Sequence, residues 1–254
     1  MSRRNGEPEL RRDPTAPDYR ESHLRLGDSY DQTLADLPFD TYMTNQEADI
    51  LRRVIPSLFG SRAPSYLDFA CGTGRITEIV RPLAGRAYGI DVSESMVRRA
   101  RERVPDADFH VIDITRAPSP VPSVELVTSF RFFGNAGDSL RHEALEAIRA
   151  QLHPGGYLIL NAHRNPRSIA SLLRHARRLD VPETLSHQTM RRMLRDHGFV
   201  VTHVFGIAGW TILDRLVTRE VLESSGAVVA ERFSRHAIPA WLCPDAVFVT
   251  QKRG

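Results

Sequence analysis

An aspartate and a series of small residues stand where an apolar segment of the chain ends. The stretch LDFACGTGR covers residues 67–75 and places Asp68 ahead of small residues at positions 70, 72 and 74. Small residues between a strand and a helix let the backbone approach a ligand closely. A carboxylate there attracts a cationic group and repels a pyrophosphate, and the spacing differs from the G-x-G-x-x-G of dinucleotide-binding loops. The stretch therefore predicts a site for a ligand that carries a positive charge.

Two further aspartates end apolar runs in the same way. Asp91 closes AYGID and Asp113 closes FHVID, while Ser129, Phe130 and Arg131 end or follow a fourth run. Ligands of doubly wound sheets bind beyond the carboxyl ends of the strands, so these side chains should face one cleft. Taken singly, each aspartate has a simpler explanation as the cap of the helix or turn that follows it. Their repetition at successive strand ends favours the ligand site.

The elements that would hold these residues alternate between strands and helices. Strand patterns are predicted at 65–70, 87–91, 109–113, 124–130, 156–163, 200–207 and 246–252, and helical patterns at 74–83, 93–104, 138–152 and 186–199. This alternation predicts an α/β fold with a mostly parallel sheet that helices cover on both faces. Further helical patterns precede the first strand and fill the interval before the last one.

The length of 254 residues allows one large domain with an elaboration. We expect a flexible N-terminal tail (1–20), a helical cap (21–60), a core (61–207), a helical insertion that forms a lid or a homodimer contact (208–244), and the final strand of the core (245–254). We expect no secretory signal, because the arginine pairs near the N-terminus have no apolar block behind them.

The composition, with 41% hydrophobic and 26% charged residues, fits a soluble globular protein. The chain has no apolar stretch near the ~20 residues that a membrane helix needs. Its two cysteines, Cys71 and Cys243, form neither a metal pattern nor a disulfide framework, so we expect a cytoplasmic protein without a metal. The basic residues are almost all arginine, since Lys252 is the only lysine. GC-rich coding explains the overall excess, and only local clusters count as candidate anion sites.

Four motifs in order resemble those of the class I S-adenosylmethionine-dependent methyltransferases. LDFACGTGR resembles the first motif, with Ala70 where the family usually has glycine, and YGIDVSESMV, FHVIDIT and LVTSFRFF stand in the positions of the second, third and fourth. LHPGGYLIL resembles the turn and strand that follow. The resemblance covers about residues 40–207 and the final strand. It implies a Rossmann-like, seven-stranded, mostly parallel sheet and S-adenosylmethionine as the cofactor.

The resemblance also implies which residues hold the cofactor. Asp91 would accept the two ribose hydroxyls, Asp113 would accept the adenine amine, and Ile114 would offer its backbone N–H to the ring. One of two tyrosines ahead of the sheet, Tyr30 or Tyr42, would close over the methionyl carboxylate. The complete set is Asp68, Ala70, Gly72, Thr73, Gly74, Asp91, Val92, Met96, Asp113, Ile114, Ser129, Phe130, Tyr30 and Tyr42.

The acceptor should bind where the fourth and fifth strands end. His163 and His142 are candidate general bases because histidine titrates near neutral pH, although a lone histidine is more often structural. Arg131 would orient an anionic acceptor or, equally, form an ion pair within the protein. These three residues are the catalytic candidates. The residues expected to contact the acceptor are Arg131, Phe132, Asn135, Arg164, Arg167 and Trp210.

These observations predict a methyltransferase that acts on a small molecule, at oxygen or nitrogen, in natural-product or saccharide tailoring. An anionic acceptor is one of the expected classes. An RNA or protein methyltransferase is an alternative, although the chain has no lysine-rich arm or appended RNA-binding domain, and SFRF replaces the Asn/Asp-Pro-Pro-aromatic motif of amine methylation on bases. A third alternative, from another class, is a non-catalytic S-adenosylmethionine-binding protein.

Overall fold

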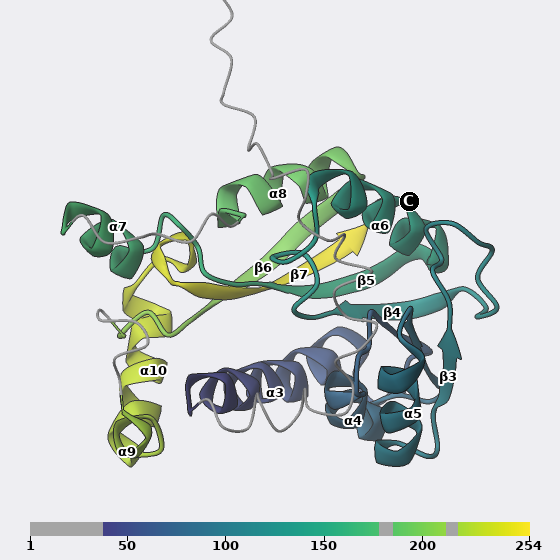
Figure 1. The fold of residues 1–254 in the computed structure, drawn as a ribbon, viewed down its shortest axis with the longest axis horizontal. Helices are drawn as coiled ribbons and strands as arrows, with labels where there is room; N and C mark the ends of the chain where they lie inside the picture. The colour runs from purple at the N-terminus through teal and green to yellow at the C-terminus, as the bar shows by residue number, and fades with distance from the viewer. Residues whose placement is uncertain (1–37, 178–184, 212–217) are drawn as a thin grey trace, which may run out of the picture.

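The computed structural model describes residues 38–177, 185–211 and 218–254. In these ranges seven strands form one sheet in the order β3-β2-β1-β4-β5-β7-β6 (Figure 1). The strands are β1 (Tyr66–Phe69), β2 (Ala87–Asp91), β3 (Asp108–Val111), β4 (Val124–Ser129), β5 (Leu152–Ala162), β6 (Phe199–Ile207) and β7 (Asp245–Lys252). The predicted tail and part of the predicted cap, including Tyr30, lie outside the described residues.

The direction of the strands confirms the predicted α/β fold. Strands β1 to β5 pair in parallel, and β7 runs antiparallel to both of its neighbours, β5 and β6. Strand β1 pairs with β2 on one side and with β4 on the other, so the order of the strands reverses next to β1. In open α/β sheets the ligand cleft lies at such a reversal, beyond the carboxyl ends of the strands.

Helices cover both faces of the sheet. They are α3 (Pro38–Phe59), α4 (Arg75–Val80), η1 (Arg81–Leu83), α5 (Glu94–Arg103), α6 (Asp138–Gln151), α7 (Ile169–Ala176), α8 (His187–Asp196), α9 (Arg219–Leu222), α10 (Ser225–Ala237) and η3 (Ala240–Leu242). Helices α6 and α8 lie on one face, and α3, α4 and α5 lie on the other (Figure 1). No helix in the described ranges combines the length and the apolar character that crossing a membrane requires.

Successive side chains of each strand point to opposite faces of the sheet and pack into two apolar layers. In β4, Leu126 packs with Leu51 of α3 in one layer, while its neighbour Val127 packs with Ile148 of α6 in the other. These side chains are fully buried. Each contributes about 1.5–3 kcal/mol to stability by leaving water, so the two layers hold the sheet and helices in register.

Two local features differ from the predictions. The stretch HPGG, predicted as a turn, lies inside β5, because Leu152 already pairs with Val124 and the register then shifts beside Gly155, whose φ is +75°. The glycine absorbs the irregularity as a bulge does. Helix α7 was not predicted, although Ile169, Leu172 and Leu173 recur at helical spacing. Its N-terminus is capped by Ser168, whose hydroxyl accepts the backbone N–H of Ser171.

Backbone strain is concentrated at the carboxyl edge of the sheet. Among the described residues, four non-glycine residues have positive φ: Ala70, Arg131, Arg164 and Ala208, with values of 54–60°. They follow β1, β4, β5 and β6. Each such conformation costs about 1–2 kcal/mol and persists only where its surroundings enforce it, most often at functional sites. The strained edge coincides with the edge where the ligand cleft is expected.

Candidate active site

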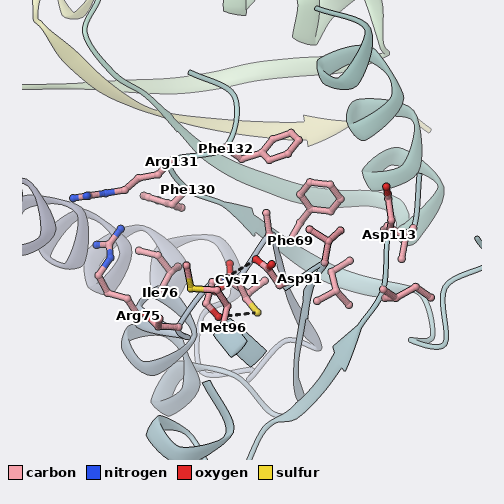
Figure 2. Close-up of a pocket in the computed structure, with 18 of the residues that line it drawn as sticks. Phe69, Cys71, Arg75, Ile76, Asp91, Met96, Asp113, Phe130, Arg131 and Phe132 are labelled. Atoms are coloured by element: carbon pink, nitrogen blue, oxygen red, sulfur yellow. Dashed lines mark hydrogen bonds between the residues drawn. The ribbon is translucent and has the colours of Figure 1, made fainter. Parts of the chain in front are cut away.

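A cavity opens at the carboxyl edge of the sheet (Figure 2). Together with the open space at its mouth it measures about 1010 Å³. The loops after β1, β2, β3 and β4 contribute to its lining. Among the predicted site residues, the lining contains Asp68, Ala70, Gly72, Thr73, Asp91, Val92, Met96, Asp113, Ile114, Phe130, Arg131 and Phe132.

Asp68 lines the cavity and is almost fully buried, with 1% of the residue exposed. The hydroxyls of Thr77 and Thr128 donate to its two oxygens at 2.7 and 2.8 Å. Burial raises the pKa of Asp68 to about 6, although these hydrogen bonds and the nearby Arg75 act in the opposite direction. A cationic group beside Asp68 would offset the cost of ionising this carboxyl.

The small residues of the first loop have separate structural tasks. Gly72 has a φ of +53°, and an added Cβ would meet no described atom within 4 Å, so the backbone borders open space. Gly74, at the N-cap of α4, has a φ of +78°, and a Cβ there would lie 3.1 Å from Ala100 of α5. Glycine therefore opens the cavity at one position and lets two helices approach at the other. Ala70 adopts the same left-handed conformation without glycine's freedom.

Two aspartates fix the loops that face the cavity. Asp91 joins the first two loops, since its Oδ2 accepts the backbone N–H of Gly72 and its Oδ1 accepts that of Ser93, both at 2.9 Å. Oδ1 of Asp113 accepts the backbone N–H and the hydroxyl of Thr115 at 3.0 and 2.6 Å. A carboxylate has about four acceptor positions, so both groups can take hydroxyl or amine donors from a ligand.

A buried polar network lies beside the cavity, between α3, β5 and the loop after β4. Glu47 of α3 is fully buried and accepts Nη1 of Arg75 at 2.9 Å. Its other oxygen accepts Nδ2 of Asn161, whose Oδ1 accepts the backbone N–H of Arg131 at 2.6 Å. Nη1 of Arg131 lies 3.1 Å from Oδ1 of Asp40. The network attaches α3 to the loop that closes one end of the cavity.

The charges of this network are paired. Burial opposes the ionisation of Glu47, but Arg75, Arg131 and His163 together hold its pKa below the usual value. Both arginines also line the cavity (Figure 2). Arg131 keeps its strained φ of +60° with its guanidinium paired to Asp40. An anionic ligand at this end would therefore compete with carboxylates of the protein.

Tyr42 and Trp210 meet in a different network, outside the cavity lining. Oη of Tyr42 donates to Glu231 at 2.6 Å, and Nε1 of Trp210 lies 3.0 Å from that Oη and 3.1 Å from the same carboxylate. Glu231 also accepts the backbone N–H of Ala208 and pairs with Arg235 at 3.2 Å. These contacts do not support the predicted roles of Tyr42 at the cofactor and of Trp210 at the acceptor. These polar groups instead fasten α10 of the insertion to α3.

The candidate bases occupy different surroundings. His142 is exposed on α6, where its Nδ1 lies 3.2 Å from Nε2 of His197, so the structure does not support a catalytic role for it. His163 lies beside the loop after β4, next to the cavity rather than in its lining. Ser129 is buried at the end of β4, and its hydroxyl has no hydrogen-bond partner among the described residues.

Three residues predicted to bind the acceptor lie away from the cavity lining. Arg164 and Arg167 are exposed in the loop after β5, and Arg167 donates to Gln188. Asn135 is also exposed, and its Nδ2 donates to the carbonyl of Arg131 at 2.7 Å. Their positions therefore do not support the predicted contacts with the acceptor.

Comparisons with known proteins agree with this geometry. A methyltransferase-domain family model matches residues 67–156. The trans-aconitate 2-methyltransferase of Paracidovorax citrulli is 30% identical over 72% of this chain and 66% of its own length. The dTDP-3-amino-3,4,6-trideoxy-alpha-D-glucopyranose N,N-dimethyltransferase of Streptomyces venezuelae is 32% identical over 48% of this chain and 50% of its own length. The magnesium protoporphyrin IX methyltransferase of Synechocystis, solved with S-adenosylhomocysteine, has a TM-score of 0.64 at 13% identity, covering 92% of this chain and 97% of that one, and shares the fold.

The chain belongs to the class I S-adenosylmethionine-dependent methyltransferases. The matched residues 67–156 include the loops after β1, β2, β3 and β4, which carry the cavity. S-adenosylmethionine is the cofactor of this family, as predicted. The methyltransferase spans 66% and 50% of the two curated relatives described above, so the acceptor does not follow from their names.

Sequence reasoning missed the buried network that joins α3 to the methyltransferase core. Glu47 and Asn161 bond across 114 positions of the chain, and no local pattern predicts such a pair. One signal was available, because Glu47 lies between the buried Met43 and Leu51 at helical spacing. A charged residue on the apolar face of a helix requires a buried partner.

Proposed function

We propose that this methyltransferase transfers a methyl group from S-adenosylmethionine to a small-molecule acceptor that binds between the loop after β4 and helix α3. The observation behind this proposal is that one continuous cavity joins the aspartates to the arginines. It runs from Asp113 and Asp91 to Arg75 and Arg131 (Figure 2), and Asp68 also lines it. One end offers carboxylates for a ribose, an amine and an ammonium group, and the other end adjoins the buried polar network.

The described residues suit the cofactor in shape and charge. The open space at Gly72 lets a ligand lie against the first loop. Asp68 would hold the ammonium group, Asp91 the ribose hydroxyls and Asp113 the adenine amine. The backbone N–H of Ile114 is the candidate for the ring nitrogen, and apolar side chains complete the lining.

The protein's part in the reaction is to hold the acceptor and to exclude water. The bound cofactor supplies a methyl group activated on a sulfonium ion. The loop after β4 has to hold the nucleophile about 3 Å from that carbon and in line with the sulfur. Phe132 packs edge-on against Phe69 with ring centroids 5.1 Å apart, which makes one wall of the cavity apolar.

We propose further that the acceptor carries a negative charge, which Arg131 binds in exchange for Asp40. Asp40 is the weaker partner to displace, because 25% of its side chain is exposed, whereas Glu47 beside Arg75 is fully buried. The acceptor named for the trans-aconitate relatives is also an anion. Arg131→Ala should raise the acceptor KM at least tenfold, and Arg167→Ala, an exposed arginine outside the cavity, should leave it unchanged.

The proposed function is tested with methyl-labelled S-adenosylmethionine and a cell extract separated into small molecules, RNA and protein. Label in the small-molecule fraction supports the proposal, and trans-aconitate and an amino sugar nucleotide are the first pure probes. Label in RNA or protein would support that alternative instead. Tight binding of S-adenosylhomocysteine without transfer to any fraction would favour the non-catalytic alternative.

We also propose that the chain divides into a helical cap, a core (61–207), an insertion (208–244) and the final strand of the core. A homodimer through the insertion would use the exposed Val229 and Phe233 of α10, and Phe233→Asp should then lower the mass measured by light scattering. A cytoplasmic location agrees with two free, buried cysteines and is tested by cell fractionation.

A further inference from the structure

His163 and Asp245 form a pair at the strained edge of the sheet. His163 follows β5, and Asp245 begins β7, the neighbouring strand. Nδ1 of His163 lies 3.4 Å from Oδ1 of Asp245, with 17% and 7% of the two side chains exposed. The same oxygen accepts the backbone N–H of Arg164 at 3.0 Å, which fixes the carboxylate beside the ring. The separation is longer than a good hydrogen bond, and such contacts often shorten only when the substrate binds.

The other ring nitrogen of His163 is not engaged by another described residue. Nε2 is buried and has no hydrogen-bond partner among the described residues. Buried polar side-chain atoms nearly always have a partner, so each exception requires an explanation such as a catalytic role. A free buried nitrogen beside an oriented carboxylate has the arrangement of a general base.

His163 lies beside the loop after β4, which bounds the acceptor end of the cavity. A Cβ added to Gly134, in the loop after β4, would lie 3.7 Å from Cδ2 of His163. Asn161, two residues before His163, holds the backbone of Arg131, which lines the cavity. Glu47 of the buried network also interacts electrostatically with His163. The imidazole therefore borders the same loop that bounds the acceptor end.

We infer that His163 is the general base of this methyltransferase and that Asp245 is a positioning residue that orients its ring. The inference rests on the proposed function and narrows the acceptor to one whose nucleophilic atom carries a proton, a hydroxyl or a protonated amine. A carboxylate nucleophile needs no base. Any negative charge that Arg131 binds then lies elsewhere on the acceptor.

The proton and the electron pairs are accounted for in one displacement. Nε2 takes the proton as the O–H or N–H bond of the acceptor breaks. The electron pair of that atom forms the new bond to the methyl carbon, and the pair of the broken C–S bond remains on sulfur. Asp245 stabilises the resulting imidazolium, which later releases its proton to water.

The first test measures the tautomer of His163 by long-range ¹⁵N–¹H NMR of histidine-labelled full-length protein, with and without S-adenosylhomocysteine. The signal is assigned by its loss in His163→Gln. The expected neutral form carries its proton on Nδ1, facing Asp245, and leaves Nε2 unprotonated, and Asp245→Asn should mix the two forms. A proton on Nε2 in the wild type would overturn the inference.

The second test compares methyl transfer to trans-aconitate, to an amino sugar nucleotide and to small alcohols. Transfer to an alcohol or amine that falls about 10²- to 10⁴-fold in His163→Gln, with unchanged S-adenosylhomocysteine affinity, supports the inference. His142→Gln, the same change at an exposed histidine, should have no effect. Equal methylation of a carboxylate by wild type and His163→Gln overturns the inference while sustaining the proposed function. Binding without transfer by the wild type contradicts the proposed function, and the NMR result then decides the orientation of the ring.

Discussion

The two halves of the carboxyl edge hold their polar groups in different ways. In the cofactor half, Asp68 of β1, Asp91 at the end of β2 and Asp113 after β3 accept hydrogen bonds from hydroxyls or backbone N–H groups, and Asp113 also lies 3.9 Å from Arg116. At the acceptor half, Glu47 and Asp245 face arginine, asparagine or histidine side chains from other elements. We expect the cofactor to add hydrogen bonds to those of the first half, and the acceptor to displace protein partners in the second half. The cofactor site would then be preformed, and the acceptor site would rearrange on binding.

The largest effect on stability should come from removing the carboxylate of Glu47. Glu47→Ala leaves Arg75 without its buried partner and Asn161 without its acceptor, so we expect a loss of about 3 kcal/mol in the free energy of unfolding. Urea denaturation measures it. Asp49→Ala on the same helix breaks ion pairs with Arg53 and Arg235 in which 57% of the aspartate side chain is exposed, and should cost less than about 1 kcal/mol. Equal losses of unfolding free energy in the two variants would contradict a larger contribution of the buried network to stability.

In the cofactor half, removing the charge of Asp68 should raise the free energy of unfolding rather than lower it. Its pKa is raised from 3.8 to about 6 in the folded protein, so the folded state binds a proton between those values that the unfolded state does not. The contribution of Asp68 to stability is then greatest below about pH 4 and is lost as the pH rises through 6. Asp68→Asn should be more stable than the wild type at pH 8, by up to about 3 kcal/mol.

Thermal and urea unfolding at several pH values test this expectation. The difference between Asp68→Asn and the wild type should shrink towards pH 4, and the variant should bind S-adenosylmethionine more weakly. A variant less stable than the wild type at every pH would mean that the buried carboxylate stabilises the fold by itself.

Tyr42→Phe separates the structural role of this tyrosine from its predicted cofactor role. Removing Oη takes a donor from the buried Glu231, and a hydrogen bond to a charged group is worth about 1.5–3 kcal/mol. We expect the free energy of unfolding to fall by an amount near the lower value. Calorimetry should show no change in the affinity for S-adenosylhomocysteine. If Tyr42→Phe instead bound S-adenosylhomocysteine tenfold more weakly with unchanged stability, the predicted contact of Tyr42 with the methionyl carboxylate would be supported.

The smallest effect is expected at Ala70. Ala70→Gly relieves a left-handed alanine that costs about 1–2 kcal/mol, but increases the entropy of the unfolded chain, so the net gain should be about 0.5 kcal/mol. Ala150→Gly, on an exposed turn of α6, should instead lose about 0.5–1 kcal/mol. Losses of the same sign at both positions would show that the first loop is not strained.

The sequence predicted the cofactor half better than the acceptor half for a physical reason. Asp68, Asp91 and Asp113 each end an apolar run, and parallel strands bring such ends to one edge. The partners of Glu47 and Glu231 come from positions 114 and 189 residues away. Such pairs depend on how α3 and α10 pack on the sheet, which local periodicity does not specify. The same gap limits the prediction of the residues that contact the acceptor. Helix α7 differs, because its apolar residues recur at helical spacing and a local signal was present.

The most direct test of the account is calorimetric titration of S-adenosylhomocysteine into the wild type, Asp91→Ala and Asp108→Ala. Asp91 links the first two loops at the cavity, whereas Asp108 is an exposed aspartate of β3 and controls for the loss of charge. We predict that Asp91→Ala weakens binding at least tenfold while Asp108→Ala binds like the wild type, with both variants folded by circular dichroism. Equal affinity of all three proteins would contradict the placement of the cofactor in this cavity.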